Sequence, residues 1–135
     1  AGKNKNIIYY SGGKMLRTML ISKLHNVKIT EKKLHYMGSI TIDKKILKAS
    51  GMQPNEKVEI YNIDDGERFA TYILEGEEGS GVIGINGAAA RLVSINDRVI
   101  VVNYGLVTEE EAKNHKATVL LFDDEENKDF TKVIK

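Results

Sequence analysis

The apolar residues of this sequence come in short or alternating runs, and glycine, asparagine, aspartate or another turn residue soon interrupts each run. Such runs are typical of strands, whereas a long helix needs apolar positions that repeat every three to four residues over a longer stretch. Asp64-Asp65-Gly66 lies between two runs and predicts a hairpin turn. The pattern therefore predicts a mainly β fold, with strands near residues 17–29, 36–42, 57–63, 67–74, 81–85, 98–104 and 117–122.

Two short helices are predicted between these strands. The first runs from Asp43 to Ser50, with Asp43 as its N-cap and Gly51 as the residue that ends it. The second runs from Thr108 to Asn114, where Thr108 is the cap and acidic residues fill the first turn. Both are too short to change the expectation of a mainly β protein.

The two ends of the sequence differ in composition from its middle. Residues 1–14 join a Lys/Asn-rich start to the flexible Ser11-Gly12-Gly13, as in an N-terminal extension or linker, and we place them outside the fold. Residues 15–135 fit one domain, because a chain of 135 residues is near the commonest domain size. The charged stretch from Asp123 to Asp129 is predicted to fray.

One sequence pattern occurs twice. Residues 55–62, NEKVEIYN, and residues 96–103, NDRVIVVN, share the order Asn, acid, base, Val, any residue, Ile or Val, any residue, Asn. Two copies in so short a chain favour a pseudo-symmetric barrel over a solenoid, because stacked repeats generally need about three units to bury their faces. The alternative, that segments leading from a turn into a strand converge by chemistry alone, stays open.

Charge and residue content argue against several classes of function. The 20 Lys and Arg against 19 Asp and Glu give a formal net charge of +1, which does not favour the many phosphate contacts of a nucleic-acid-binding protein. The lack of cysteine excludes disulfides and thiolate nucleophiles, and the three scattered histidines give no reason to expect a metal site. No run approaches the ~20 apolar residues of a membrane span, so we expect no membrane partner and a soluble, cytoplasmic protein.

Motifs of the commoner enzyme mechanisms are absent, and this leaves the pair Gly38-Ser39 as a candidate. The sequence has no Walker-type loop, dinucleotide fingerprint or Gly-x-Ser-x-Gly elbow. A protein without pyridoxal phosphate can still make an electron sink by converting a backbone serine into a pyruvoyl group. That step needs a small residue with an unshielded carbonyl, followed by serine as the internal nucleophile. Taken alone, the pair is more typical of a bulge or bend in a strand.

The surrounding motifs are similar to those of a known family. In order and spacing the sequence resembles the pyruvoyl-dependent aspartate 1-decarboxylases over residues 15–122, through the segments MLRTM, KLH, LHYMGS, RFATY and NGAAA. The resemblance implies a small six-stranded double-psi β-barrel with short helices, and a zymogen that cuts itself between Gly38 and Ser39. It also implies a pyruvoyl group at residue 39, which forms a Schiff base with L-aspartate and yields β-alanine for pantothenate biosynthesis. A homotetramer with active sites between subunits is implied as well.

The resemblance further implies roles for single residues. Ser39 and Tyr72 are the expected catalytic residues, with Tyr72 as the acid that returns a proton after CO2 leaves. Self-processing is expected to involve Gly38, Ser39, Thr71, Tyr36 and His25, with the Thr71 hydroxyl on the oxyanion that forms at the Gly38 carbonyl. Substrate binding is expected to involve Lys23, Arg68, Thr71, Asn86, Gly87, Ala88 and Ala89.

Residue chemistry alone leaves alternatives open at these positions. Arg68 has the planar fork that binds a carboxylate with two hydrogen bonds, although an exposed strand cation would look the same. Lys23 and His25 share a face if their segment is a strand. Thr71 and Tyr72 point to opposite faces of a regular strand, so both serve one site only through a twist or bulge, or in different subunits.

Asn86-Gly87 would ordinarily be a hairpin turn, but it also suits the start of a short helix whose N–H groups approach a ligand carboxylate. The sequence departs from the family at Met37, where members often carry an acid, and at Tyr61, where an indole is common.

The competing functions are a nucleic-acid-binding regulator built on a small barrel and a non-catalytic interaction domain that is never cleaved.

Overall fold

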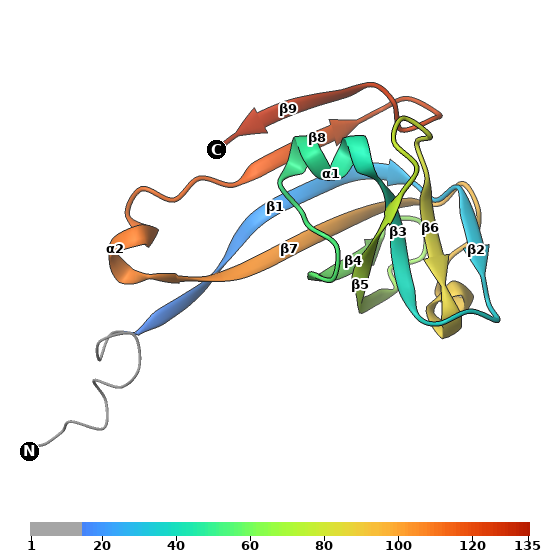
Figure 1. Ribbon diagram of the computed structural model, residues 1–135, viewed down its shortest axis with the longest axis horizontal. Coiled ribbons are helices and arrows are strands. Elements are labelled where there is room, and N and C mark those ends of the chain that lie inside the picture. The colour runs from blue at the N-terminus through green and yellow to red at the C-terminus, as the bar shows by residue number, and fades with distance from the viewer. Residues whose placement is uncertain (1–14) are drawn as a thin grey trace, which may run out of the picture.

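The computed structural model describes residues 15–135 as a strongly twisted sheet of nine strands, with short helices attached (Figure 1). The predicted extension at residues 1–14 lies outside the described residues. The mainly β prediction is confirmed. In chain order the elements are β1 (Leu16–Lys28), β2 (Glu31–Lys33), β3 (Ser39–Asp43), α1 (Lys44–Ser50), β4 (Lys57–Asn62), β5 (Arg68–Gly76), β6 (Ile83–Asn86), the 3₁₀ helix η3 (Gly87–Leu92), β7 (Arg98–Thr108), α2 (Glu109–Ala112), β8 (Thr118–Phe122) and β9 (Phe130–Ile134).

The sheet closes into a barrel because β1 and β2 act as one bent strand. β1 pairs with β7 along its whole length, and β2, which follows directly, pairs with β6. Between them, the Thr30 N–H donates to the Ile83 carbonyl at 2.9 Å. The other neighbours run β6-β3-β5-β4-β7, so six strand positions complete a ring. This ring, with its parallel β2–β6 and β3–β5 pairs, is the predicted small double-psi β-barrel.

The sequence repeat corresponds to a structural repeat. Asn55 and Asn96 both adopt positive φ angles, 74° and 81°, in the turns that lead into β4 and β7. β4 and β7 pair antiparallel, with Ile60 opposite Val101, the residue that occupies the same place in the other copy. A local two-fold axis therefore passes between these two side chains, and the pseudo-symmetric interpretation is confirmed at this pair of strands.

The barrel interior is aliphatic, and the predicted caps hold the helices against it. The Asp43 carboxylate accepts a hydrogen bond from the Lys45 N–H at 2.8 Å, and Gly51 ends α1 with φ 82°. Thr108 and Glu111 form a capping box on α2, which ends at Ala112 and is shorter than predicted. The fully buried side chains include those of Leu24, Val27, Ile29, Ile40, Ile42, Ile46, Ile60, Ile73, Ile83, Ile85 and Leu120.

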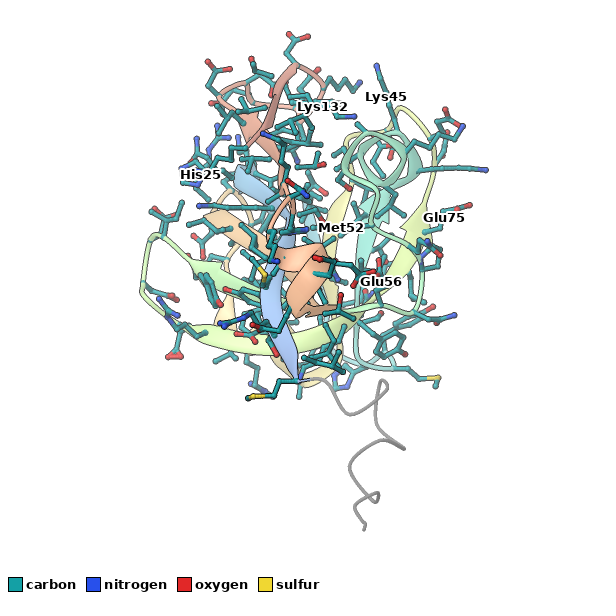
Figure 2. The ribbon with its side chains drawn as sticks, turned by 90° about the vertical axis from the view of Figure 1, so that its left-hand side faces the viewer. His25, Lys45, Met52, Glu56, Glu75 and Lys132 are labelled. Atoms are coloured by element: carbon teal, nitrogen blue, oxygen red, sulfur yellow. The ribbon has the colours of Figure 1, made fainter. Side chains whose placement is uncertain are left out.

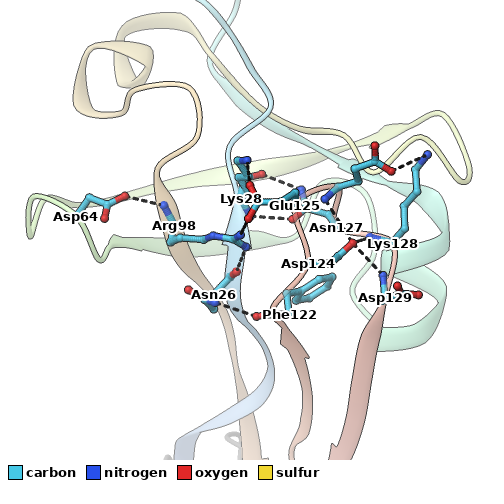
Figure 3. A network of polar contacts seen from close by, with 11 residues as sticks. Asn26, Lys28, Asp64, Arg98, Phe122, Asp124, Glu125, Asn127, Lys128 and Asp129 are labelled. Atoms are coloured by element: carbon cyan, nitrogen blue, oxygen red, sulfur yellow. Dashed lines mark hydrogen bonds and ion pairs between the residues drawn. The ribbon is translucent and has the colours of Figure 1, made fainter.

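The prediction that residues 123–129 fray is wrong. Asn127 is buried, and its side chain accepts from the Lys28 N–H at 2.9 Å and donates to the carbonyls of Lys28 and Gly81 at 2.8 and 3.0 Å (Figure 3). The Asp124 carboxylate accepts from the Lys128 N–H at 2.9 Å, which closes the loop on itself. These bonds satisfy buried backbone groups that composition cannot reveal, and they lead the chain into β9, which the sequence analysis did not predict.

The predicted strand at 36–42 begins later than expected, at Ser39, because residues 34–36 form a turn. β2 was also missed, since its three residues are charged and become a strand only by pairing with β6. Within residues 15–135, no helix is long and apolar enough to cross a membrane.

Candidate functional site

Ser39 is buried on the outer side of the barrel wall. It begins β3, is 1% exposed and lies opposite Asn86 at the end of β6. The Asn86 amide donates to Ser39 Oγ at 2.8 Å and to Thr41 Oγ1 at 3.1 Å. Ile40 and Ile42 point into the barrel, so Ser39 and Thr41 share the opposite face. Asn86 therefore fixes the position of the Ser39 hydroxyl.

A tight backbone contact lies directly before Ser39. Gly87 starts η3 with φ 78°, and a Cβ at this residue would lie 2.8 Å from Gly38 Cα, 2.9 Å from Gly38 N and 3.1 Å from the Tyr36 carbonyl oxygen. Only glycine fits this position without displacing the backbone of the 36–38 segment. Asn86-Gly87 is therefore not a hairpin turn but the start of a short helix, which was the second of the two interpretations.

β5 brings Tyr72 beside Ser39. β3 and β5 run parallel with Ile40 opposite Ile73, and the same register one residue earlier places Ser39 beside Tyr72. One more step brings Thr71 level with the residue before Ser39. The β4–β5 pairing is regular through Thr71 and Tyr72, so their side chains point to opposite faces. Tyr72 shares the outer face with Ser39, whereas Thr71 lies on the other face, near the peptide that precedes the serine.

Other predicted site residues lie in the turn before β3 and in η3, which follows β6. Tyr36 is 53% exposed, and Lys33 Nζ lies 5.9 Å from the centre of its ring. Ala88 is exposed and Ala89 half-buried in the first turn of η3. A cavity of about 320 Å³ beside η3 is lined by Lys32, Leu34, Ala90 and Arg91.

Lys23 and His25 lie on β1, away from Ser39. As predicted, they share a face, and the charge of Lys23 adds to burial, the larger cause, in lowering the pKa of His25. In one direction round the barrel β7, β4 and β5 lie between β1 and β3, and in the other direction β2, not β1, pairs with β6. Figure 2 shows His25 and Glu75, which lies on the strand next to β3, on opposite sides of the view. No hydrogen bond or ion pair within residues 15–135 links Lys23 or His25 to Ser39.

Arg68 lies on the same face of β5 as Tyr72, four residues earlier, a separation of about 13 Å at roughly 3.3 Å per residue. Its Cζ lies 4.2 Å from the centre of the Tyr61 ring, which is directly opposite on β4. Among the described residues, neither Arg68 nor Lys23 takes part in an ion pair. Both cations are therefore available to an anion.

Strand pairing places the two cations on one continuous surface. In one row across the strands, Lys23 lies opposite Val102, and Val102 lies opposite Glu59. In the next row, Ile100 lies opposite Tyr61, and Tyr61 lies opposite Arg68. A groove of about 470 Å³ runs along this surface, lined by Thr18, Lys57, Val58, Glu59, Val102, Tyr104 and Leu106. We call the surface formed by Lys23, Glu59, Tyr61, Arg68 and Tyr104 the cationic face. Its Glu59, Tyr61 and Tyr104 were not predicted as site residues, because their meeting depends on a register that the sequence does not display.

The chain thus carries two sets of predicted site residues. Gly38, Ser39, Thr71, Tyr72, Asn86 and Gly87 come together at one end of β3, with Tyr36 in the adjoining turn. Lys23, His25 and Arg68 lie on the cationic face and do not reach Ser39 within one chain. Residues 15–135 contain no group of three or more His, Cys, Asp or Glu side chains placed to bind a metal ion.

Comparison with known proteins identifies the family. Residues 15–129 match the family model described as aspartate decarboxylase. Proteins named aspartate 1-decarboxylase from Caldicellulosiruptor bescii, Bacillus licheniformis and Listeria monocytogenes are 51% identical over 111 residues, 52% over 110 and 53% over 110, and each match covers 82% of this chain and 87% of the relative. A solved structure of the rationally designed mkDPBB_sym_86 protein matches 58% of this chain and 92% of its own, with 18% identity and a TM-score of 0.45. From the family model and the three relatives, we conclude that the chain belongs to the aspartate decarboxylase family of enzymes.

Proposed function

We propose that this protein converts L-aspartate to β-alanine and CO2, with a pyruvoyl group that it makes from its own Ser39. Family membership supports the reaction. The observation that carries the proposal is the fixed position of Ser39, with its hydroxyl held by Asn86 and the preceding Gly38 packed against Gly87.

The residues around Ser39 suit a pyruvoyl group at this position. A Cβ on Gly87 would fill the space between Gly87 and Gly38. Because both residues are glycines, neither places a side chain in this space. The Asn86 amide is a neutral donor that can bond a hydroxyl oxygen before cleavage and a carbonyl oxygen afterwards. Among the described residues, the hydrogen bond to Ser39 Oγ comes from the Asn86 amide, and no acidic or basic side chain is hydrogen-bonded to this oxygen.

Self-cleavage then follows from the chemistry of serine and glycine. The Ser39 hydroxyl oxygen attacks the Gly38 carbonyl carbon, the C–N bond breaks, and the nitrogen takes the hydroxyl proton, which leaves an ester. Loss of the Ser39 α-proton expels the Gly38 carboxylate, and one water molecule hydrolyses the remaining enamine to a keto group with release of ammonia. We assign Thr71 to the oxyanion at Gly38 and Tyr36 to a supporting role in this step. His25 does not reach Ser39 in its own chain, so we assign its supporting role to the site of a neighbouring subunit.

A pyruvoyl group at residue 39, held beside Asn86 and Gly87, would supply the electron sink that decarboxylation of an amino acid needs. Tyr72, beside Ser39 on the outer face, is the acid that returns a proton to the former α-carbon, since its phenol O–H is a donor. Arg68 and Lys23 bind carboxylate oxygen, and the backbone N–H groups of Ala88 and Ala89 face the other end of the substrate.

We propose that the working form is a homotetramer with each site shared between neighbours. The unpaired Lys23 and Arg68 lie on the cationic face, out of reach of Ser39 in the same chain. Tyr104 and Leu106, which are 42% and 66% exposed, line the groove on that face. A second copy that covers the cationic face with the Ser39 end of its barrel would bury this apolar surface and complete the site. We further propose a cytoplasmic enzyme whose β-alanine supplies pantothenate biosynthesis.

The test combines intact mass spectrometry with an assay of β-alanine formed from L-aspartate. The parent protein should split into residues 1–38 and 39–135, with the second fragment lighter than a serine-ended fragment by the mass of one ammonia. Ser39→Ala should stay whole and form no β-alanine. The proposal fails if the parent never splits on prolonged warming, if Ser39→Ala splits at the same bond, or if the fully cleaved parent leaves aspartate unchanged.

A further inference from the structure

Arg68 is held on the cationic face by an aromatic ring and not by an acid. Its Cζ lies 4.2 Å from the centre of the Tyr61 ring, and the two residues are direct partners in the β4–β5 ladder. A guanidinium that stacks on a ring keeps its five N–H groups directed outward along its own plane. Within residues 15–135, no carboxylate forms an ion pair with Arg68. The fork of the guanidinium is therefore both oriented and free.

Tyr61 is itself fixed through its hydroxyl group. The oxygen lies 3.0 Å from Glu59 Oε1 and 3.3 Å from the hydroxyl oxygen of Tyr104 on β7. A carboxylate only accepts, so the single hydrogen of Tyr61 goes to Glu59, and Tyr104 donates to Tyr61. The bond with Tyr104 is the largest cause of a raised pKa at Tyr61, followed by burial and the bond with Glu59. The phenol therefore stays protonated at neutral pH.

We propose that Tyr61 is a positioning residue that sets the plane of Arg68 for one carboxylate of the substrate, and that Tyr104 and Glu59 fix Tyr61 in turn. This inference rests on the proposed function and deepens it. The carboxylate received is the side-chain group that remains in the product, because a clamp on the departing carboxylate would stabilise the charge that the reaction must release.

The expected signature is a change in KM with little change in kcat. The retained carboxylate carries the same charge before, during and after loss of CO2, so Arg68 binds it equally at each stage. A residue that acts through Arg68 must show the same pattern. Tyr61 touches no reacting atom in this scheme, and its effect must disappear once Arg68 is removed.

The experiment is a double-mutant cycle on the cleaved protein, with Tyr61→Leu, Arg68→Met and the double variant. Tyr61→Leu should raise KM for L-aspartate by about 3- to 30-fold, the range expected for one cation–π contact, with kcat within about twofold of the parent. The double variant should be no worse than Arg68→Met alone. Tyr61→Trp keeps an aromatic face under the guanidinium and should restore KM to within about threefold of the parent.

Tyr104→Phe is the matched variant for the hydroxyl chain, since it removes one oxygen and leaves every ring in place. It should raise KM by about two- to fourfold without altering kcat. If Tyr61→Leu does not fold, the KM of Tyr104→Phe still tests the inference. Additive effects of Tyr61→Leu and Arg68→Met, a Trp variant no better than Leu, or a parental KM in Tyr104→Phe would each overturn the inference. A cleaved parent without aspartate turnover overturns the proposed function instead, so the two failures are distinct.

Discussion

Alanine in place of Gly87 should slow self-cleavage while leaving the fold intact. Gly87 has φ 78°, and a Cβ on it would lie 2.8 and 2.9 Å from backbone atoms of Gly38. Ordinary van der Waals contact begins at 3.4 Å, so Gly38 has to move by about half an ångström in a closely packed site. The bond to be cut is the one that follows Gly38, and its carbonyl carbon must meet the Ser39 hydroxyl at attack distance.

The size of the effect follows from separating backbone strain from steric displacement. A non-glycine residue in the left-handed region costs about 1–2 kcal/mol in unfolding free energy. Gly66 has φ 81° with nothing within 4 Å of its Cβ position, so Gly66→Ala carries this strain alone. Gly87→Ala carries the strain and also displaces Gly38. Because a misplacement near 1 Å can cost about 10²-fold in rate, we expect cleavage to slow by about 30- to 100-fold in Gly87→Ala and not in Gly66→Ala.

The assay follows the intact and cleaved masses of both variants and the parent over time at one temperature. Urea unfolding is measured with each glycine substitution placed in the uncleaved Ser39→Ala chain. Ser39→Ala serves as the uncleaved reference. Both glycine variants should lose a similar amount of unfolding free energy, with a somewhat larger loss for Gly87→Ala. Equal cleavage rates in the two variants would refute the argument that the contact between Gly87 and Gly38 positions the bond.

Three other predictions concern the acid, the C-terminal loop and pH. Tyr72→Phe should still cleave at Ser39 but lose about 10²–10⁴-fold in kcat, the usual worth of a positioned acid, and a variant with near-parental turnover would show that water or another residue delivers the proton. Asn127→Ala removes three hydrogen bonds to buried backbone groups and should lower the unfolding free energy by about 2–4 kcal/mol in urea titrations. Asn114 is exposed, so Asn114→Ala should change the unfolding free energy little. Equal losses in the two variants would contradict the role of Asn127. Because burial and Lys23 lower the folded-state pKa of His25 below its ordinary 6.5, the unfolded chain takes up this proton first as pH falls. Unfolding free energy should therefore decrease as pH drops through about 6.5 and level off below the folded pKa, and urea midpoints of His25→Asn should lack this component.

The features that sequence reasoning recovered are local ones. The turn at residues 64–66 joins β4 and β5 as an antiparallel pair, and Asp43 and Thr108 cap their helices as predicted. Each of these depends on residues within a few positions of one another, so the signal is contained in one short window. The repeat at residues 55–62 and 96–103 was readable for the same reason, because each copy is a turn followed by its own strand.

The features that were missed depend on contacts between distant segments. β2 and β9 have no strong strand pattern, and they form because β6 and β8 offer unpaired edges. Asn127 looks like one more polar residue in a charged tail, yet it satisfies backbone groups of Lys28 and Gly81. The stack of Arg68 on Tyr61 requires the β4–β5 register, which no single window contains.

The two-fold relation also explains why the site occurs once and not twice. In each half a strand leads into a short helix and then into an Asn turn, and Asp43 and Asn86 occupy the same place, directly before α1 and η3. Asp43 caps its helix and also accepts from the N–H groups of Gly79 and Gly81, both at 2.8 Å. Asn86 makes no capping bond, and its amide is turned to Ser39 instead.

Loss of a helix N-cap costs about 1 kcal/mol. The second helix, which lacks a side-chain cap, is a 3₁₀ helix, whereas the capped first helix is an α-helix. Across the β3–β6 pair, Asn86 lies opposite Ser39. By the two-fold relation, Asp43 corresponds to Asn86, and the residue opposite Asp43 is Val82, whose carbonyl accepts from the Asp43 N–H at 3.0 Å. One half therefore keeps the arrangement that stabilises the barrel. In the other half, Asn86 does not cap its helix, and its amide instead holds the Ser39 hydroxyl next to the Gly38 carbonyl group.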